Sequence, residues 1–528
     1  MRFRSHLLSI GLGVACLGLA GAQTDVLTVH NDRARTGQYL TEATLTPSNV
    51  NSTSFGKLFQ ATLDSVVDAQ PLYVAGVAIP NQGTHNVLIV ATENDSLYAL
   101  DADSGAQLWK ASLLATGEKP SDTRSCSQVE PQIGITSTPV IALKPGAGGA
   151  IFAMAMSKDS SGKYHQRLHK VSLTTGKDIA TAAEITAKYP GSGEDSRGGY
   201  AYFDPAQYKE RSGLLLLNGV VYLGWASHCD IQPYTGWIMG YSGTTLKQVS
   251  VIDVTPNGDE GAIWGAGAGM AADANGFIYF LDANGTFDTT LNGQGFPQHG
   301  DYGNAFVKLS AANNQLTVAD YFTMSNTTAE SNADEDLGSG GSIVLPDMTD
   351  STGATRHLAI GAGKDGNIYL VDRDNMGKFN PNNDNAIYQE IDNALPNGIW
   401  SMPAYFNGKV YFGAQNAPIR AFQFTQARLA AAPVATTPTT FGYPGASPSV
   451  SANGTANGIM WAVQNNSTAV LHAYSADNIG VELYNSNQAG SRDHFGNGNK
   501  FMVPTIANGK VYVGTPNGVA AFGLLAAK

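Results

Sequence analysis

Short runs of alternating apolar and polar residues, separated by Gly-containing turns, recur along most of the chain. The last of them, "MVPTIANGKVYVGTPNGVAAFGLL", runs from Met502 to Leu525 and holds three such runs. Its first two runs are joined by Asn508-Gly509, a pair that favours a two-residue hairpin turn because both positions need positive φ. The pattern therefore predicts three antiparallel strands at the C-terminal end.

Seven related units precede this one, each with four alternating runs in its fuller form. The first extends from Gln70 to Leu113, the second begins at Ser137, and the third ends at Val254. The runs are short and follow a period of two, without a sustained helical period. A four-stranded antiparallel unit repeated at this spacing is typical of a β-propeller, in which stacking around an axis buries both faces of every unit.

The last unit lacks a fourth strand, and a spare strand stands near the other end of the chain. "GKLFQATL", from Gly56 to Leu63, alternates like a strand but precedes the first complete unit. We therefore predict an all-β, eight-bladed propeller of four-stranded antiparallel blades over residues 55–528, closed by this N-terminal strand. An array of β-sandwiches is the alternative, but it would not explain one spare and one missing strand. Residues 23–54 are polar and aperiodic, and predict an N-terminal arm.

Composition narrows the choice of partners. Hydrophobic residues make up 43% of the chain and charged residues only 14%, with 60 glycines, which suits short strands and tight turns. The formal net charge of -12 argues against nucleic acid or an anionic membrane as the main partner, since both attract basic proteins.

The first 22 residues have the pattern of a signal peptide. Arg2 and Arg4 precede an apolar stretch that is too short for a confident membrane span, and small residues around Ala22 offer a cleavage site. We expect a secreted or periplasmic protein with no transmembrane span. Lipid attachment at Cys16 is the alternative.

Cleavage would leave two cysteines, Cys126 and Cys229. Two cysteines in an exported chain favour one disulfide. The alternative is a pair of unrelated buried thiols. The propeller prediction favours the disulfide, because it places both residues in loops on one face of the ring.

The segment "ALDADSGAQLW", Ala99 to Trp109, resembles the tryptophan-docking repeat of the pyrroloquinoline-quinone-like propellers, with Ser104 in place of Thr. Later units resemble the repeat more weakly; the second keeps Thr175-Gly176 but lacks the Trp. The resemblance implies the propeller fold. It also implies, as one activity among several, an alcohol or sugar dehydrogenase that uses pyrroloquinoline quinone with calcium. The adjacent cysteine pair of quinone alcohol dehydrogenases is missing, although sugar-oxidising relatives do without it.

Loops that link blades share one face of a propeller with loops between second and third strands, so candidate site residues can be sorted by loop. Two carboxylates and two histidines could serve as acid or base, and two aromatic and three cationic residues could bind a ligand. The catalytic candidates are Glu210, Asp336, His228 and His494; the candidates for binding a ligand or cofactor are Trp264, Trp400, Arg211, Lys364 and Arg492. We predict no metal site, although Asp282, Asn284 and Asp288 are spaced loosely like a calcium loop.

Three functions are compatible with this pattern. The first is an exported propeller whose channel mouth binds a small molecule, a glycan or a partner protein without catalysis. The second is the quinone-dependent dehydrogenase that the resemblance implies. The third is a polysaccharide lyase or glycoside hydrolase that uses carboxylates and histidines at the mouth.

Overall fold

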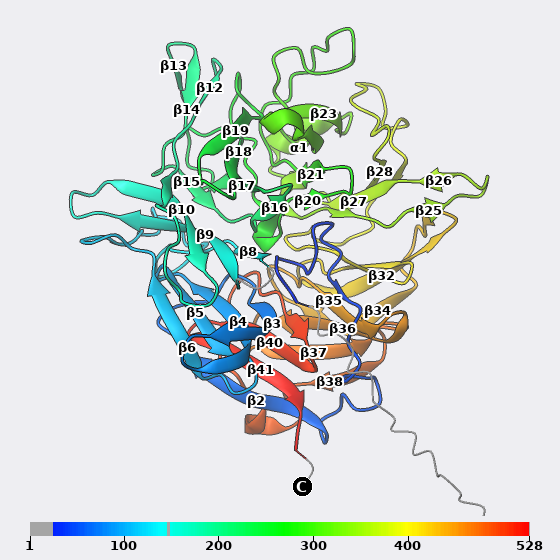
Figure 1. Cartoon of the computed structure of the whole chain (residues 1–528). Helices are drawn as coiled ribbons and strands as arrows, with labels where there is room; N and C mark the ends of the chain where they lie inside the picture. The colour runs from blue at the N-terminus through cyan, green and yellow to red at the C-terminus, as the bar shows by residue number, and fades with distance from the viewer. Residues whose placement is uncertain (1–24, 145–147, 527–528) are drawn as a thin grey trace, which may run out of the picture.

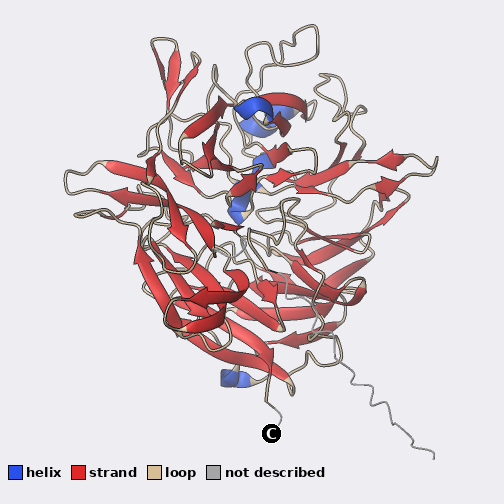
Figure 2. Ribbon diagram, viewed as in Figure 1, coloured by secondary structure: helices blue, strands red, loops and turns tan. Residues whose placement is uncertain are grey.

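The computed structural model describes residues 25–144 and 148–526, and nearly all of its regular structure is β-strand (Figure 2). Eight sheets of four or five strands, with two smaller sheets, make up this part of the chain. Neighbouring strands within the large sheets are antiparallel, except where β1 joins β35 in parallel. The expected all-β class and propeller architecture are therefore confirmed. The predicted signal peptide and Cys16 lie outside the described residues.

The first four large sheets in chain order are formed by β3 (Leu72–Ile79), β4 (Gly83–Thr92), β5 (Ser96–Asp101) and β6 (Gln107–Ser112); by β7 (Lys119–Pro120), β8 (Val140–Leu143), β9 (Gly149–Lys158), β10 (Tyr164–Ser172) and β11 (Ala183–Glu184); by β15 (Tyr208–Glu210), β16 (Leu215–Leu217), β17 (Val220–Ser227), β18 (Trp237–Ser242) and β19 (Gln248–Asp253); and by β20 (Ala271–Ala272), β21 (Phe277–Leu281), β22 (Phe306–Ser310) and β23 (Thr317–Phe322).

The other four are formed by β24 (Ile343–Val344), β27 (Leu358–Ala362), β28 (Ile368–Asp372) and β29 (Gln389–Ile391); by β30 (Ala404–Phe406), β31 (Lys409–Phe412), β32 (Ala417–Thr425), β33 (Arg428–Leu429) and β34 (Ala435–Phe441); by β1 (Gln38–Tyr39), β35 (Ser449–Asn453), β36 (Ala456–Gln464), β37 (Val470–Ser475) and β38 (Glu482–Asn485); and by β2 (Phe55–Thr62), β39 (Thr505–Ala507), β40 (Lys510–Thr515) and β41 (Gly518–Leu524).

The remaining elements are short additions to these sheets. The small sheets contain β12 (Lys188–Pro190), β13 (Ser196–Arg197) and β14 (Tyr200–Tyr202), and β25 (Met348–Thr349) and β26 (Thr355–Arg356). The helices are α1 (Thr327–Asn332) and the 3-10 turns η1 (Gly265–Gly267), η2 (Ala312–Asn314), η3 (Leu337–Ser339) and η4 (Gly490–Arg492). Within the described ranges, no helix has the length and apolar character needed to cross a bilayer.

The tryptophan of the repeat motif packs between neighbouring sheets. The indole of Trp109, on β6, is 9% exposed and donates a hydrogen bond of 3.1 Å to the carbonyl of Leu173 in the second sheet. Gly176 lies against the ring, and a Cβ there would come within 2.6 Å of it. Gly176 also has a φ of 69°, which favours glycine. Gly176 and the Leu173 carbonyl of the second unit therefore form the contact surface for Trp109 of the first.

Strand β2 pairs with β41, so the two ends of the chain share one sheet, where blue and red strands lie side by side in Figure 1. The pairing runs from Phe55 opposite Leu524 to Thr62 opposite Gly518. Phe55 is fully buried, and its ring lies 5.5 Å from that of Trp461 in the preceding sheet. The N-terminal strand thus joins the last sheet and packs against the sheet before it.

Residues 25–39 form a central segment that contacts all eight large sheets, visible as the dark blue chain in the middle of Figure 1. Its backbone bonds to one strand in each of six sheets (β3, β8, β20, β24, β30 and β35), through Tyr73, Ile141, Ala272, Val344, Tyr405 and Val450. The side chains of Arg35 and Tyr39 reach the other two sheets, at Leu214 and Asn508. The polar residues of this arm are therefore largely buried, because they bond to the strand edges nearest the axis.

Arg35 is the most deeply buried charge of this central segment. Its side chain is fully buried and donates to Thr28 Oγ1 at 2.6 Å and to the carbonyl of Val29 at 2.9 Å. It also donates to the carbonyls of Met270 at 3.0 Å and Leu214 at 3.2 Å. Burial lowers the pKa of Arg35 to about 10, so the group stays charged at neutral pH. One guanidinium thus holds the arm to strands of two different sheets.

A buried carboxyl at the end of β19 predicts a pH dependence of stability. Asp253 is 2% exposed and accepts hydrogen bonds from Thr235 Oγ1 at 2.7 Å and from the Thr255 amide at 3.0 Å. Burial raises its pKa to about 8, against about 3.9 in an unfolded chain. The folded state therefore binds the extra proton between these values, and its stability falls as pH rises through them.

We expect the free energy of unfolding in urea to decrease between pH 5 and pH 8, with roughly 1–3 kcal/mol of the decrease due to Asp253. In Asp253→Asn this part of the pH dependence should disappear. Thr317→Ser, at an exposed residue that carries no charge, should keep the wild-type slope. An unchanged slope in Asp253→Asn would contradict the assignment.

Candidate functional site

Loops that belong to most of the large sheets meet in a small pocket of about 60 Å³. The pocket is lined by Gln128, Arg211, Asp230, Trp264, Asn284, Asp336, Ser339, Lys364, Trp400, Tyr443 and Phe501. Five of these are predicted site residues: Trp264, Trp400, Arg211, Lys364 and Asp336. The sequence distributes them over 190 positions, and the fold brings them together.

Two kinds of loop supply the pocket. Trp264, Asp336 and Trp400 precede the first strands of their sheets, whereas Asn284 and Lys364 follow second strands, β21 and β27. In a four-stranded antiparallel sheet both loops emerge at the same end. The pocket therefore lies where the strand ends converge on the central axis. On its inner side the same first strands bond to residues 25–39.

A buried ion pair forms the charged part of the pocket. Lys364 Nζ lies 2.6 Å from Asp336 Oδ1 and also contacts Asp334. Asp336 is 1% exposed, and burial raises its pKa although Lys364 opposes the shift. Burial disfavours the charged form of Lys364, but the two aspartates outweigh this and raise its pKa. A carboxylate with a raised pKa beside a fixed cation can accept a proton and orient a polar substrate.

A second cation faces the pocket under an aromatic ring. The guanidinium of Arg211 is 4% exposed and lies 4.0 Å from the centre of the Phe501 ring. Lys209 is 1% exposed, lies 5.7 Å from the centre of the Trp264 ring and donates to Gln128 at 3.2 Å. Burial lowers the pKa of Lys209 well below its usual value, with Arg211 adding to the effect. Arg211 thus offers the pocket a positive charge beside a flat ring, which suits a planar anion.

Glu210 and His228, two of the predicted catalytic residues, are buried and do not line the pocket. Glu210 is 2% exposed, and burial raises its pKa well above the usual value. His228 is 1% exposed, and burial lowers its pKa to about 3, so its imidazole is neutral. The structure therefore does not bring these two residues and Asp336 together in one open centre.

Arg492 and His494 lie beside the N-terminal strand, away from the pocket residues. Arg492 Nη2 donates to the carbonyls of Ser52 and Phe55, each at 3.0 Å, and pairs with Asp493 at 2.6 Å. His494 is exposed, and its carbonyl accepts a hydrogen bond from Lys57. Their loop folds outward over β2 instead of towards the axis, because the buried Asp493 bonds to the Lys57 amide.

The predicted disulfide is confirmed. Cys126 and Cys229 are bonded across a separation of 103 residues. Gln128 stands two positions after Cys126, and Asp230 directly follows Cys229, so each cysteine lies next to a pocket residue. The disulfide therefore ties together two loops that form one side of the pocket.

Removal of this disulfide should lower stability. In Cys126→Ser/Cys229→Ser we expect the free energy of unfolding in urea to fall by about 2–4 kcal/mol, because a long loop in the unfolded chain is no longer closed. Ser48→Ala/Ser161→Ala, two substitutions outside the pocket, should change it by less than about 0.5 kcal/mol. Equal effects of the two double variants would show that the disulfide contributes nothing.

Several lining residues were not among the predicted site residues. Ser339, Tyr443 and Phe501 stand in long connections between sheets, and Gln128 stands in the long loop between β7 and β8; the sequence has no regular period in these segments. Asn284 lines the pocket, whereas Asp288 bonds to His299 on the insertion that follows β21. In the ranges described, no group of three or more His, Cys, Asp or Glu side chains is arranged to hold a metal ion.

Comparisons with known proteins identify the fold and no closer kinship. No protein-family model and no curated protein matches the chain. The quinohemoprotein alcohol dehydrogenase from Comamonas testosteroni has a similar structure, with a TM-score of 0.61 and 14% identity over 96% of this chain and 82% of that one. Quinohemoprotein alcohol dehydrogenase ADHIIG from Pseudomonas putida gives 0.63 and 14% over 96% and 81%.

A europium-containing methanol dehydrogenase is also similar, with a TM-score of 0.61 and 13% identity over 95% of this chain and 98% of that one. The resemblance to pyrroloquinoline-quinone-like propellers is thereby confirmed for the fold. Because only 13–14% of the residues are identical, these structural similarities do not show that this protein has the same activity.

Proposed function

We propose that the protein is an exported quinone-dependent dehydrogenase that oxidises an alcohol or a sugar in the pocket at the channel mouth. The observation that carries this proposal is the pairing of Asp336 with Lys364 in a pocket that Trp264 and Trp400 also line. A carboxylate with a raised pKa can remove a substrate hydroxyl proton, and flat rings beside fixed cations can hold a planar anionic cofactor. Dehydrogenases are known with this fold, so the proposed activity is compatible with the architecture.

The proposal includes a closed ring. In it, each of the eight large sheets is one blade, and β2 completes the blade formed by the last three strands. Closure holds the strand ends around the axis in fixed positions, which a site assembled from distant loops requires. Export is supported by the disulfide, because such bonds persist in oxidising compartments.

The side chains of the pocket fit pyrroloquinoline quinone by their chemistry. Arg211 and Lys364 would pair with its carboxylates, and Trp264 and Trp400 would contact its rings. The oxygens of Asn284 and Asp336 are of the kind that calcium binds. The bound quinone would supply the acceptor for two electrons. Asp336 would hold the proton taken from the substrate, and Lys364 would keep that carboxylate in place.

The pocket has to open before such a ligand can enter. Its volume of about 60 Å³ is far below the range of about 300–1,000 Å³ that is usual for small-ligand sites. Phe501 covers Arg211 and has a φ of 63°, which is unusual for a residue with a large side chain. We infer that Phe501 moves away from Arg211 when ligand binds.

Truncation of Phe501 tests this step. In Phe501→Ala the quinone should associate about 2–10-fold faster, because the cation–π contact with Arg211 no longer has to be broken. Stopped-flow quenching of Trp fluorescence measures the rate. Phe59→Ala, in β2, is the control and should associate at the wild-type rate. A slower or unchanged rate in Phe501→Ala would contradict a covering role.

Quinone titration tests the function itself. The purified protein is titrated with pyrroloquinoline quinone, with and without calcium, and then assayed for dye reduction with primary alcohols and aldoses. We expect binding and oxidation of at least one substrate, with affinity reduced more than about tenfold in Arg211→Met. Arg428→Met removes a surface arginine that stacks on Tyr388 at 3.9 Å and should bind normally. Absence of quinone binding under both conditions would overturn the proposal.

A further inference from the structure

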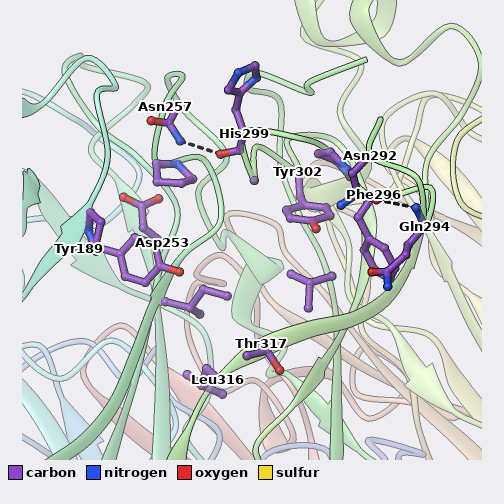
Figure 3. A pocket seen from close by; sticks show the side chains of 16 residues that line it. Tyr189, Asp253, Asn257, Asn292, Gln294, Phe296, His299, Tyr302, Leu316 and Thr317 are labelled. Atoms are coloured by element: carbon purple, nitrogen blue, oxygen red, sulfur yellow. Dashed lines mark hydrogen bonds between the residues drawn. The ribbon is translucent and has the colours of Figure 1, made fainter. Parts of the chain in front are cut away.

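A second, larger cleft lies on the outer part of the molecule, where the third and fourth large sheets meet. It has a volume of about 630 Å³ and is open to solvent (Figure 3). One wall comes from Tyr189 on β12 and from Ile252 and Asp253 at the end of β19. The other comes from the insertion between β21 and β22 and from the residues that begin β23. Neither the hairpin of β12 nor this insertion is needed to complete a four-stranded sheet.

The lining combines aromatic rings with amide side chains. Tyr189 and Phe296 are half-buried, Tyr302 is 7% exposed, and Asn292 and Gln294 are exposed. Figure 3 shows these groups around one opening. No Lys or Arg is among the residues that line it. Rings with amide groups between them bind a ligand that has an apolar face and hydroxyl groups at its edge.

The insertion wall is held rigidly in place. Asn292 Oδ1 accepts hydrogen bonds from the amides of Gln294 and Phe296, at 2.9 and 3.1 Å. Lys378 Nζ lies 4.3 Å from the centre of the Phe296 ring and donates to the Gln294 carbonyl at 2.8 Å. The Tyr321 hydroxyl donates to the Gly295 carbonyl at 2.8 Å. A wall fixed before binding costs little entropy when a ligand docks.

The amide groups on this wall remain available to a ligand. The Asn292 amide nitrogen and the Gln294 side chain make no hydrogen bond to any part of the chain that the structure describes. Burial raises the pKa of Asp253 to about 8, so its carboxyl is uncharged in mildly acidic to neutral solution and can donate a hydrogen bond. Asp195, Asp301, Tyr189 and Tyr208 are the titratable groups around it. The cleft therefore presents donors and acceptors with little net charge.

We propose that this cleft is a binding site for a neutral oligosaccharide, separate from the pocket at the channel mouth. The rings of Tyr189 and Phe296 stack on the apolar faces of the sugar rings, and Asn292 and Gln294 bond to their hydroxyl groups. The volume lies within the range of about 300–1,000 Å³ that is usual for small-ligand sites, so a short oligosaccharide fits. An anionic saccharide is disfavoured, because neither Lys nor Arg lines the cleft to pair with its carboxylates.

The test measures binding of cellotriose, maltotriose, xylotriose, mannotriose and trigalacturonate to the full-length protein by saturation-transfer NMR and calorimetry. We expect at least one neutral trisaccharide to bind and trigalacturonate not to bind. Affinity should fall by at least about tenfold in Phe296→Ala and in Gln294→Ala, with no change in quinone binding. Gln107→Ala, an exposed glutamine on β6, should bind as the wild type does.

Three results would overturn the proposal. One is the absence of binding by any neutral trisaccharide, and another is binding of trigalacturonate as tightly as the neutral trisaccharides. The third is wild-type affinity in both cleft variants, which would locate the sugar elsewhere. Because Gln294 is an exposed side chain, Gln294→Ala should fold even if Phe296→Ala does not. The quinone titration of the same samples is independent, so failure of the dehydrogenase proposal leaves this result interpretable.

Discussion

Arg35→Met should lower the free energy of unfolding by about 3–5 kcal/mol, the largest effect on stability that we expect from a single substitution. The guanidinium satisfies the carbonyls of Val29, Met270 and Leu214 in a fully buried environment. Methionine fills part of the space but leaves the carbonyls of Val29 and Met270 without this donor, and Leu214 with only the longer bond of 3.4 Å from Thr28 Oγ1. Urea denaturation followed by Trp fluorescence measures the change.

Arg33→Met provides the matched control, because Arg33 belongs to the same segment and is exposed. It should change the free energy of unfolding by less than about 0.5 kcal/mol. Arg35→Lys keeps the charge but loses the branched donor geometry and should give an intermediate value. If Arg35→Met were as stable as Arg33→Met, residues 25–39 would not be the centre around which the sheets are assembled.

Asp336→Asn should reduce the turnover of the quinone-loaded protein by about 100- to 10,000-fold while quinone affinity changes little. Asparagine has the same shape but cannot accept the substrate proton. The loss of the carboxylate should therefore lower kcat, which is measured by dye reduction with the substrate that the wild type oxidises fastest. The pH dependence of the wild-type rate should follow one group with a raised pKa, since burial raises that of Asp336.

Asp334→Asn is the control for charge, because Asp334 also pairs with Lys364 but is mostly exposed. It should retain turnover within about threefold of the wild type. A similar loss in both variants would mean that the carboxylates act only by holding Lys364. Retention of turnover in Asp336→Asn would exclude it as the base.

The strands and tight turns could be predicted from the sequence, because residues close together in the chain determine them. Asn508-Gly509 fixes a hairpin turn, and the alternation in the strands after it fixes which face is buried. The pairing of β2 with β41 followed from counting strands. The central position of residues 25–39 could not be predicted, since their polar sequence resembles that of a surface segment. Their burial depends on strand edges that exist only once the sheets have assembled.

The sequence could predict those site residues whose loops can be assigned to one face of the propeller. Trp264, Trp400 and Lys364 stand close to strands, so their positions follow from the repeat. Arg492 and His494 stand in the middle of a long loop that turns back over β2, and no local pattern indicates that direction. Phe501 precedes β39 as closely as Trp400 precedes β30, but its cover over Arg211 depends on a contact between two loops far apart in the sequence. The oligosaccharide cleft is built from two insertions, whose pairing across space the repeat does not encode.

The ribosome makes β2 early and β41 last, although these two strands pair in one sheet. While the chain is still emerging from the ribosome, β2 has no partner, and the central arm meets sheets that arrive one at a time. Final assembly must therefore wait until β41 has been made. A chain truncated before Gly518 would keep most of its residues but leave an apolar seam exposed, and we expect it to aggregate instead of remaining a smaller folded protein.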